Sequence, residues 1–382
     1  MIPVNQNPTL KLAHDLSFED LYRREGLMQI DALFLISLKA ADEALHKRLL
    51  AAREDSATLA PVETSALLMD VAFNVEHFLC ELFGVQDAVQ ERAEKQHMLT
   101  ALYDCKRQFV QRAAKNTAAE ESDGETLTAA MQALCGKPFD ELHYAEQVLE
   151  WLTDPKANAD FLDTAARYAA WAIHTRAGRQ KHAQGVLFKL PHKLDFHHLV
   201  PLEIAEHDEM RVMRLPREQL RLRQGFKLTD PGADLRGAID QANYCIWCHK
   251  QGRDSCSTGL KDKKSEAFKK SPLGVTPTGC PLEEKISEMN LLMSQGNPIG
   301  ALAMVVVDNP MVAGTGHRIC NDCMKSCIYQ RQDPVDIPQI ETRMLKEVLN
   351  LPWGFEIYSL LTRWNPLNLN RPLPAADSGY KV

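Results

Sequence analysis

The cysteines of this chain are crowded into one segment, and this crowding limits what the segment can fold into. Seven of the ten cysteines fall within the 83 residues from Cys245 to Cys327. The N-terminus shows no basic stretch followed by an apolar one, so we expect no secretory signal and a cytoplasmic location. Thiols in that reducing compartment are expected to stay free or bind a metal rather than form disulfides.

The spacing of these cysteines narrows the choice of metal. It reads Cys245-x2-Cys248-x7-Cys256-x23-Cys280-Pro281, and later Cys320-x2-Cys323-x3-Cys327. Seven thiols fit two four-ligand sites when one oxygen or nitrogen ligand is added. Thiolates favour zinc and iron–sulfur clusters, and a cysteine before proline is typical of ferredoxin-type runs. Two iron–sulfur clusters are therefore the first interpretation, with zinc and ordinary thiols as alternatives.

Four motifs in the same region carry a resemblance to a known family. GCPLEEKI, QGNPIGALAMVVVDNP, TGHRICNDCMKSC and PVDIPQIE follow one another between about residues 240 and 345. In this order they resemble the N-terminal cluster domain of the glutamate synthase small subunit and dihydropyrimidine dehydrogenase. The resemblance implies two [4Fe–4S] clusters in an α-helical ferredoxin-like domain.

The resemblance also implies a ligand set. The first cluster would be held by Cys245, Cys248, Cys256 and Cys327. The second would be held by Cys280, Cys320, Cys323 and Glu341. The spacing around Cys256 is wider than the family's pattern, so this residue departs most from the expected arrangement.

The function implied by the resemblance is electron transfer within an FAD- and NAD(P)H-dependent oxidoreductase. The clusters would pass electrons between a flavin and an acceptor, with an FAD/NAD(P)H-binding domain or subunit as partner and room for a further redox subunit. The chain has no G-x-G-x-x-G nucleotide-binding run, so it is not expected to catalyse unaided. Its Pro-rich tail suggests the hypothesis that an FAD domain follows. The alternative is a zinc-stabilised helical interaction protein without redox activity.

We expect a mainly α-helical chain with three parts. Residues 1–240 form a helical domain of unknown role, 241–350 the double-cluster domain, and 351–382 a linker. Apolar periodicity predicts helices over 17–53, 62–83, 86–117, 126–135, 140–152 and 158–178. The net charge of −7 argues against a general affinity for nucleic acid. No apolar run is long enough to span a membrane, and homo-oligomerisation is left open.

Several other features have a simpler interpretation. Cys80, Cys105 and Cys135 lie in apolar helical contexts and are expected to be core thiols. The arginine-rich run from Arg211 to Lys227 is expected to be a solvated face rather than a docking face. Among the histidines, the group formed by His192, His197, His198 and His207 is not expected to bind a metal, because adjacent side chains such as those of His197 and His198 diverge.

Overall fold

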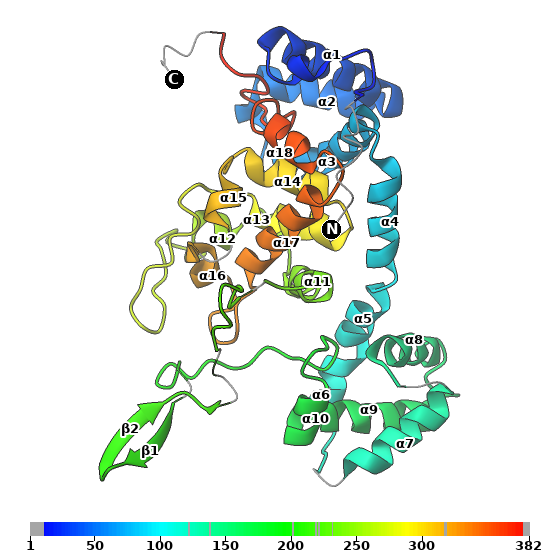
Figure 1. The fold of residues 1–382 in the computed structure, drawn as a ribbon, viewed down its shortest axis with the longest axis vertical. Helices are drawn as coiled ribbons and strands as arrows, with labels where there is room; N and C mark the ends of the chain where they lie inside the picture. The colour runs from blue at the N-terminus through cyan, green and yellow to red at the C-terminus, as the bar shows by residue number, and fades with distance from the viewer. Residues whose placement is uncertain are drawn as a thin grey trace.

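The structure, a computed structural model, confirms a mainly helical protein (Figure 1). It describes residues 11–376 except 121–122, 137–138, 201, 218–219, 221, 231 and 317–318. In this described part, the sheet content is one two-stranded hairpin. None of the described helices is long and apolar enough to cross a membrane.

In its described residues, the first half of the chain forms ten α-helices and a π-helical turn. A 3-10 turn at Phe18–Leu21 precedes them, and a Ser17–Asp20 capping box begins it. The helices are α1 (Arg24–Ala41), α2 (Glu43–Glu54), α3 (Pro61–Phe83), α4 (Gln86–His97), α5 (Thr100–Cys105), the π-helix η3 (Lys106–Val110), α6 (Gln111–Asn116), α7 (Gly124–Cys135), α8 (Glu141–Trp151), α9 (Ala159–His174) and α10 (Arg176–Lys181).

The second half begins with a hairpin and returns to short helices. Its elements are β1 (Glu203–His207), β2 (Met210–Arg214), α11 (Leu235–Tyr244), the 3-10 helix η6 (Cys248–Gln251), α12 (Ser255–Thr258), α13 (Ile286–Ser294), α14 (Pro298–Val306), α15 (Val312–Thr315), α16 (Asp322–Ser326), α17 (Ile337–Leu349) and α18 (Gly354–Leu361). The break between α13 and α14 lies at Gly296-Asn297-Pro298, because Asn297 caps α14 and Pro298 occupies its first turn.

Helices from both ends of the chain share one core. Helix α3 packs against α14, and α14 packs against α17 and α18. The rings of Phe34, Phe78 and Trp364 meet at centroid distances of 5.6 to 5.8 Å. The expected boundary near residue 240 therefore does not separate two cores. The stretch expected to be a linker instead contains α18 and the fully buried Trp364.

Helices α1 to α3 and α11 to α18 form what we call the main lobe. Helices α5 to α10 form a second lobe, and α4 connects the two (Figure 1). Its core is aromatic: the ring of Tyr144 lies 5.1 Å from Phe188, and Tyr168 lies 5.6 Å from Phe188. Cys105 is fully buried in this lobe, and Cys80 is buried in the main lobe, whereas Cys135 is only partly buried. The sequence did not predict the separation into lobes.

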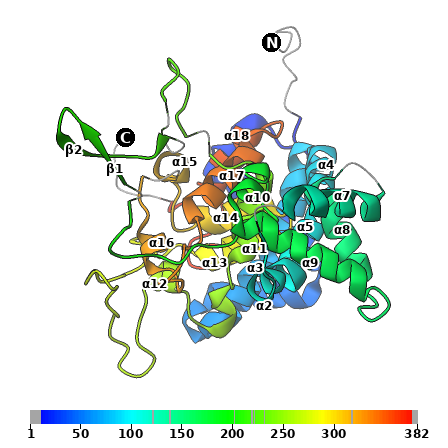
Figure 2. The same ribbon diagram turned by 90° about the horizontal axis from the view of Figure 1, so that it is seen from below.

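The arginine-rich run contains β2 of the hairpin, which projects away from both lobes (Figures 1 and 2). The strands pair antiparallel, and Arg214 forms an ion pair with Glu203 on the opposite strand. The nearby histidines do not converge. His192, His198 and His207 contact separate carboxylates, those of Asp333, Asp195 and Asp208 respectively.

Candidate functional site: two groups of buried thiols

The cysteine region is built around four helices of the main lobe. Helix α11 packs against α13 and α17, and α14 packs against α13 and α17. Helix α11 ends at Tyr244, so Cys245 is the first residue after it. The short helices α12 and α16 pack against each other and carry Cys256 and Cys323. Thiols that are far apart in the sequence therefore lie close together beside these four helices.

The first group, here called thiol site A, consists of Cys245, Cys248, Cys256 and Cys327. The thiol of Cys256 forms a hydrogen bond with the sulfur of Cys327. Cys327 acts electrostatically on Cys245 and on Cys248, and Cys245 acts on Cys248. Cys256 and Cys327 are buried, and the other two thiols are partly exposed. The spacing around Cys256 therefore does not keep it from the other three.

The pKa values within thiol site A differ because hydrogen bonding dominates at Cys327, whereas burial dominates at Cys245 and Cys248. The hydrogen bond from Cys256, aided by backbone N–H groups of Ile328, Tyr329 and Val335, lowers the pKa of Cys327 to about 7. Burial raises the pKa of Cys245 to about 11 and that of Cys248 to about 12. Cys327 is therefore the thiol most easily deprotonated, and a thiolate is the form that binds metal.

The second group, thiol site B, consists of Cys280, Cys320, Cys323 and Glu341. Burial raises the pKa of Cys280 and of Cys323, and the carboxyl of Glu341 adds to the effect on both. Cys320 is exposed, and its Sγ lies 3.6 Å from Oδ2 of Asp322. Thus Cys280, Cys323 and Glu341 are close neighbours, and Cys320 lies at the surface, three residues before Cys323 in the chain.

Glu341 lies next to a second carboxyl that sequence reasoning missed. It lies on α17, is 9% exposed and forms a hydrogen bond with Glu284. Asn309 Nδ2 donates to Oε1 of Glu284 at 2.7 Å, which fixes that side chain. Burial, with the charge of Glu284, raises the pKa of Glu341 to about 8. Two buried carboxyls in contact cannot both ionise without a cation nearby.

The two groups are joined through the backbone. The N–H of Cys280 donates to the carbonyl oxygens of Cys256 and Ser257, both at 2.9 Å. Gly279 precedes it with a φ of 91°, and a Cβ at that position would lie 2.3 Å from the carbonyl oxygen of Ser257. Glycine is therefore needed before Cys280, because no side chain fits where the two segments approach.

A third carboxyl beside the thiols was also missed. Asp254 caps α12, and its Oδ1 accepts from the N–H of Cys256 at 3.1 Å while Oδ2 accepts from Ser287 at 3.0 Å. Burial, with the charge of Glu288, raises the pKa of Asp254 to about 7. An aspartate before a four-residue helix is an ordinary cap in the sequence, so only the fold reveals its place beside thiol site A.

Two histidines lie close to these cysteines in the sequence, His249 after Cys248 and His317 before Cys320. His249 is buried, and its Nδ1 lies 2.7 Å from Oγ of Ser287. Burial lowers its pKa, which favours the neutral ring. His317 lies outside the described residues.

The donors of both sites are anionic when deprotonated and are largely buried. Such a set is costly to ionise unless a positive charge binds to it. In the described ranges, however, no three His, Cys, Asp or Glu side chains are arranged to hold one metal ion.

Titration of Glu341 is expected to weaken the metal-free protein as the pH rises. A carboxyl whose pKa is raised on folding, here from 4.5 to about 8, favours the folded state only while protonated. This stabilisation is complete below pH 4.5, the ordinary pKa, and is lost as the pH rises through about 8, the pKa in the folded protein. Glu341→Gln stays neutral, so we expect it to raise the free energy of unfolding at about pH 8.5 by on the order of a few kcal/mol, with little change near pH 5.

Urea denaturation of chelator-treated protein at the two pH values measures this effect. Glu283→Gln is the matched control, because Glu283 lies on the surface. Equal stability of wild type and Glu341→Gln at the higher pH would show that Glu341 is already ionised in the folded state.

The fold and the two sites define a mainly helical protein that brings buried thiols and carboxyls together. A family model described as the RP005 N-terminal alpha-helical domain matches residues 12–84. The uncharacterized protein RP005 of Rickettsia prowazekii (strain Madrid E) is 31% identical over 303 residues, which cover 75% of this chain and 99% of the relative. The chain belongs to the RP005 family.

A second relative matches a shorter part of the chain. The uncharacterized protein RP006 of the same organism is 65% identical over 72 residues, which are 19% of this chain and 10% of that protein. No solved structure matches the chain.

The assignment to the family of the glutamate synthase small subunit and dihydropyrimidine dehydrogenase is therefore wrong. The matching family model and both relatives point to RP005 and RP006 instead. The motifs that suggested it have local causes: Asn297 caps α14, Pro298 starts it, and Gly279 permits a close backbone approach. Such signals occur wherever short helices start or segments meet, so their order alone did not identify a family.

Proposed function

We propose that this protein is an electron-transfer protein with one [4Fe–4S] cluster at thiol site A and one at thiol site B. Bound clusters supply one-electron transfer, which amino-acid side chains do not provide unaided. Thiol site A would contribute four thiolates. Thiol site B would contribute three thiolates and the carboxylate of Glu341.

The observation that carries the proposal is the convergence at thiol site A. Cys327 comes from the far end of the cysteine region, yet it lies close enough to Cys245, Cys248 and Cys256 to raise the pKa of each. Backbone N–H groups also point at its sulfur. N–H donors to cysteine sulfur are one means by which proteins set the reduction potential of a cluster.

The chain's own residues would give the two sites different properties. Replacing a thiolate by the carboxylate of Glu341 changes the ligand chemistry at thiol site B, and ligand charge is a further determinant of potential. Glu284, held by Asn309, orients Glu341. Burial of Cys256, Cys323 and Cys327 limits access of water to the sulfurs.

A zinc-stabilised interaction protein is the second candidate. The thiols alone would suit it, because zinc also prefers sulfur. The FAD/NAD(P)H-binding partner was implied by the family resemblance alone. It is untested and stays a prediction.

Metal analysis of protein purified without oxygen tests the proposal. We expect about eight iron atoms and about eight acid-labile sulfides per chain, with broad absorbance near 400 nm that bleaches on reduction with dithionite. Colourless protein with stoichiometric zinc and no sulfide would replace the cluster proposal by the zinc-stabilised alternative.

A further inference from the structure

The second lobe has an open cavity of about 650 Å³, away from the thiol sites. Its wall is formed by α7, by Trp171 of α9 and by the α10 region, including Lys181. This volume lies within the range of about 300 to 1,000 Å³ that is usual for small-molecule sites. The thiol sites make no use of this lobe.

The cavity wall contains a buried donor without a partner. Trp171 is 4% exposed, and its indole Nε1 has no acceptor among the described residues. Buried tryptophan N–H groups are usually hydrogen-bonded, because leaving one unsatisfied costs about 1–3 kcal/mol. A Cβ on Gly124 would lie 2.9 Å from Nε1 and 2.5 Å from Cζ2. Gly124, itself on the cavity wall, therefore packs directly against the indole edge, where no side chain would fit.

A cation lies on the same wall. Lys181 Nζ is 5.7 Å from the ring centroids of Phe139, Tyr168 and Trp171, and it donates to Oγ1 of Thr128 at 2.9 Å. These aromatic faces and the hydroxyl hold the ammonium, and they leave its remaining protons free to bind a ligand. Partial burial lowers the pKa of Lys181, which agrees with a position beside the ring cluster.

A hydrogen-bonded group beneath the cavity fixes this wall. The hydroxyl of Tyr168 lies 2.9 Å from His182 Nε2, and His182 Nδ1 lies 3.2 Å from Oε1 of Glu141. Oε2 of Glu141 accepts from the backbone N–H groups of Val186 and Leu187. Because His182 follows Lys181 directly, this group positions the end of α10 before any ligand binds.

We propose that this cavity binds a small organic monocarboxylate. The carboxylate would pair with the ammonium of Lys181, beside the indole edge of Trp171. The apolar body would lie against the indole and the small side chains of α7. Glu125 also lines the cavity, and its negative charge disfavours ligands with two or more charges, such as phosphate monoesters.

Titration of the ¹⁵N-labelled full chain with sodium benzoate tests this site. The chain has five tryptophans, so the indole region of the spectrum is sparse, and Trp171→Phe assigns the signal of Trp171. We expect this signal to shift saturably with benzoate, and not with the neutral benzyl alcohol. Phenyl phosphate should bind more weakly than benzoate.

Variants distinguish the site from nonspecific binding. Lys181→Met should weaken benzoate binding by about tenfold or more, as expected for loss of a charge-assisted contact. Lys156→Gln, on an exposed lysine of the same lobe, should bind as the wild type does. Unmoved signals of the other four tryptophans establish that Lys181→Met is folded. No saturable shift, tighter binding of phenyl phosphate, or unaltered binding by Lys181→Met would each overturn the proposal.

Discussion

Replacing Cys327 by alanine is expected to remove one cluster and leave the other. Cys327 is 3% exposed and lies beside the other thiols of thiol site A. It is not among the groups that shift the pKa values of Cys280 and Cys323 in thiol site B. The iron content of anaerobically purified protein should therefore fall from about eight to about four atoms per chain. Acid-labile sulfide should fall in the same proportion.

Two variants make this result specific. Cys135→Ala removes a partly buried cysteine from the second lobe, and it should keep the full iron content. Glu341→Ala should change the absorbance of the cluster at thiol site B and leave that of the cluster at thiol site A, because Glu341 belongs to thiol site B. Full iron content in Cys327→Ala would exclude Cys327 as a ligand. Equal spectral change in the two single variants would contradict the division into two sites.

The sequence predicted the helices well where local signals agree. Apolar periodicity and the left-handed Gly84 (φ 63°) bound α3, and Asn297-Pro298 separates α13 from α14. The expected helix over 17–53 is interrupted instead, because Asp42 ends α1 and caps α2 with its side chain. A polar residue in an amphipathic run looks like part of the exposed face, so periodicity alone conceals such a cap.

The candidate site was predictable only in part. The crowding of cysteines indicated the metal-binding segment, because spacing within the chain is visible. The acidic neighbours Asp254 and Glu284 were not identified, since their approach to the thiols depends on how α12, α13 and α17 pack. The unpaired indole of Trp171 is likewise a property of packing, and no residue pattern reports a missing acceptor.

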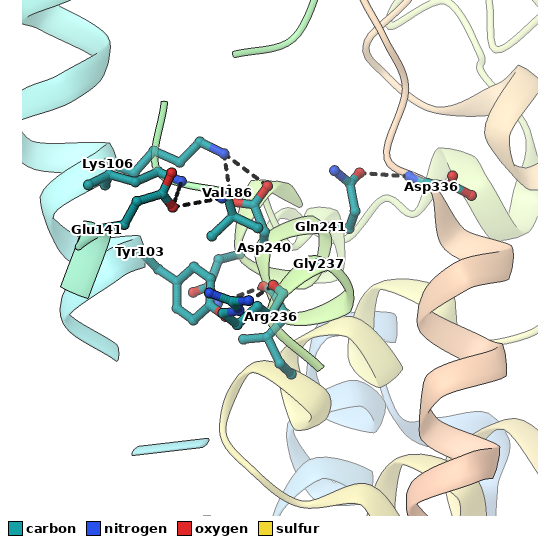
Figure 3. Close-up of polar contacts among 12 residues, drawn as sticks. Tyr103, Lys106, Glu141, Val186, Arg236, Gly237, Asp240, Gln241 and Asp336 are labelled. Atoms are coloured by element: carbon teal, nitrogen blue, oxygen red, sulfur yellow. Dashed lines mark hydrogen bonds and ion pairs between the residues drawn. The ribbon is translucent and has the colours of Figure 1, made fainter. Parts of the chain in front are cut away.

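The second lobe reaches the cysteine region through a buried ion pair. Lys106 Nζ lies 2.7 and 2.9 Å from the two carboxylate oxygens of Asp240, as Figure 3 shows. Both residues are buried, and the hydroxyl of Tyr103 donates to the carbonyl oxygen of Arg236 nearby, at 3.1 Å. Lys106 begins the π-helix η3, and Asp240 lies on α11, which ends directly before Cys245. The pair therefore connects the lobe to the helix that positions thiol site A.

Lys106→Met is expected to destabilise the protein by about 3–5 kcal/mol, because it leaves the carboxylate of Asp240 buried without its cation. Burial already raises the pKa of Asp240 despite Lys106, so the loss should be smaller at low pH, where the carboxyl takes up a proton. Urea denaturation followed by circular dichroism measures the change. Lys106→Met/Asp240→Leu removes both charges and should recover most of the lost stability.

The control for this pair is Lys47→Met, which breaks an exposed pair with Glu43 one turn away on α2. Exposed pairs of this kind contribute only about 0.3–0.5 kcal/mol, so the control should unfold almost as the wild type does. Equal, small effects of Lys106→Met and Lys47→Met would show that water reaches Asp240. A double variant as unstable as Lys106→Met would instead assign the loss to packing of the lysine side chain, because removing the second charge would have restored nothing.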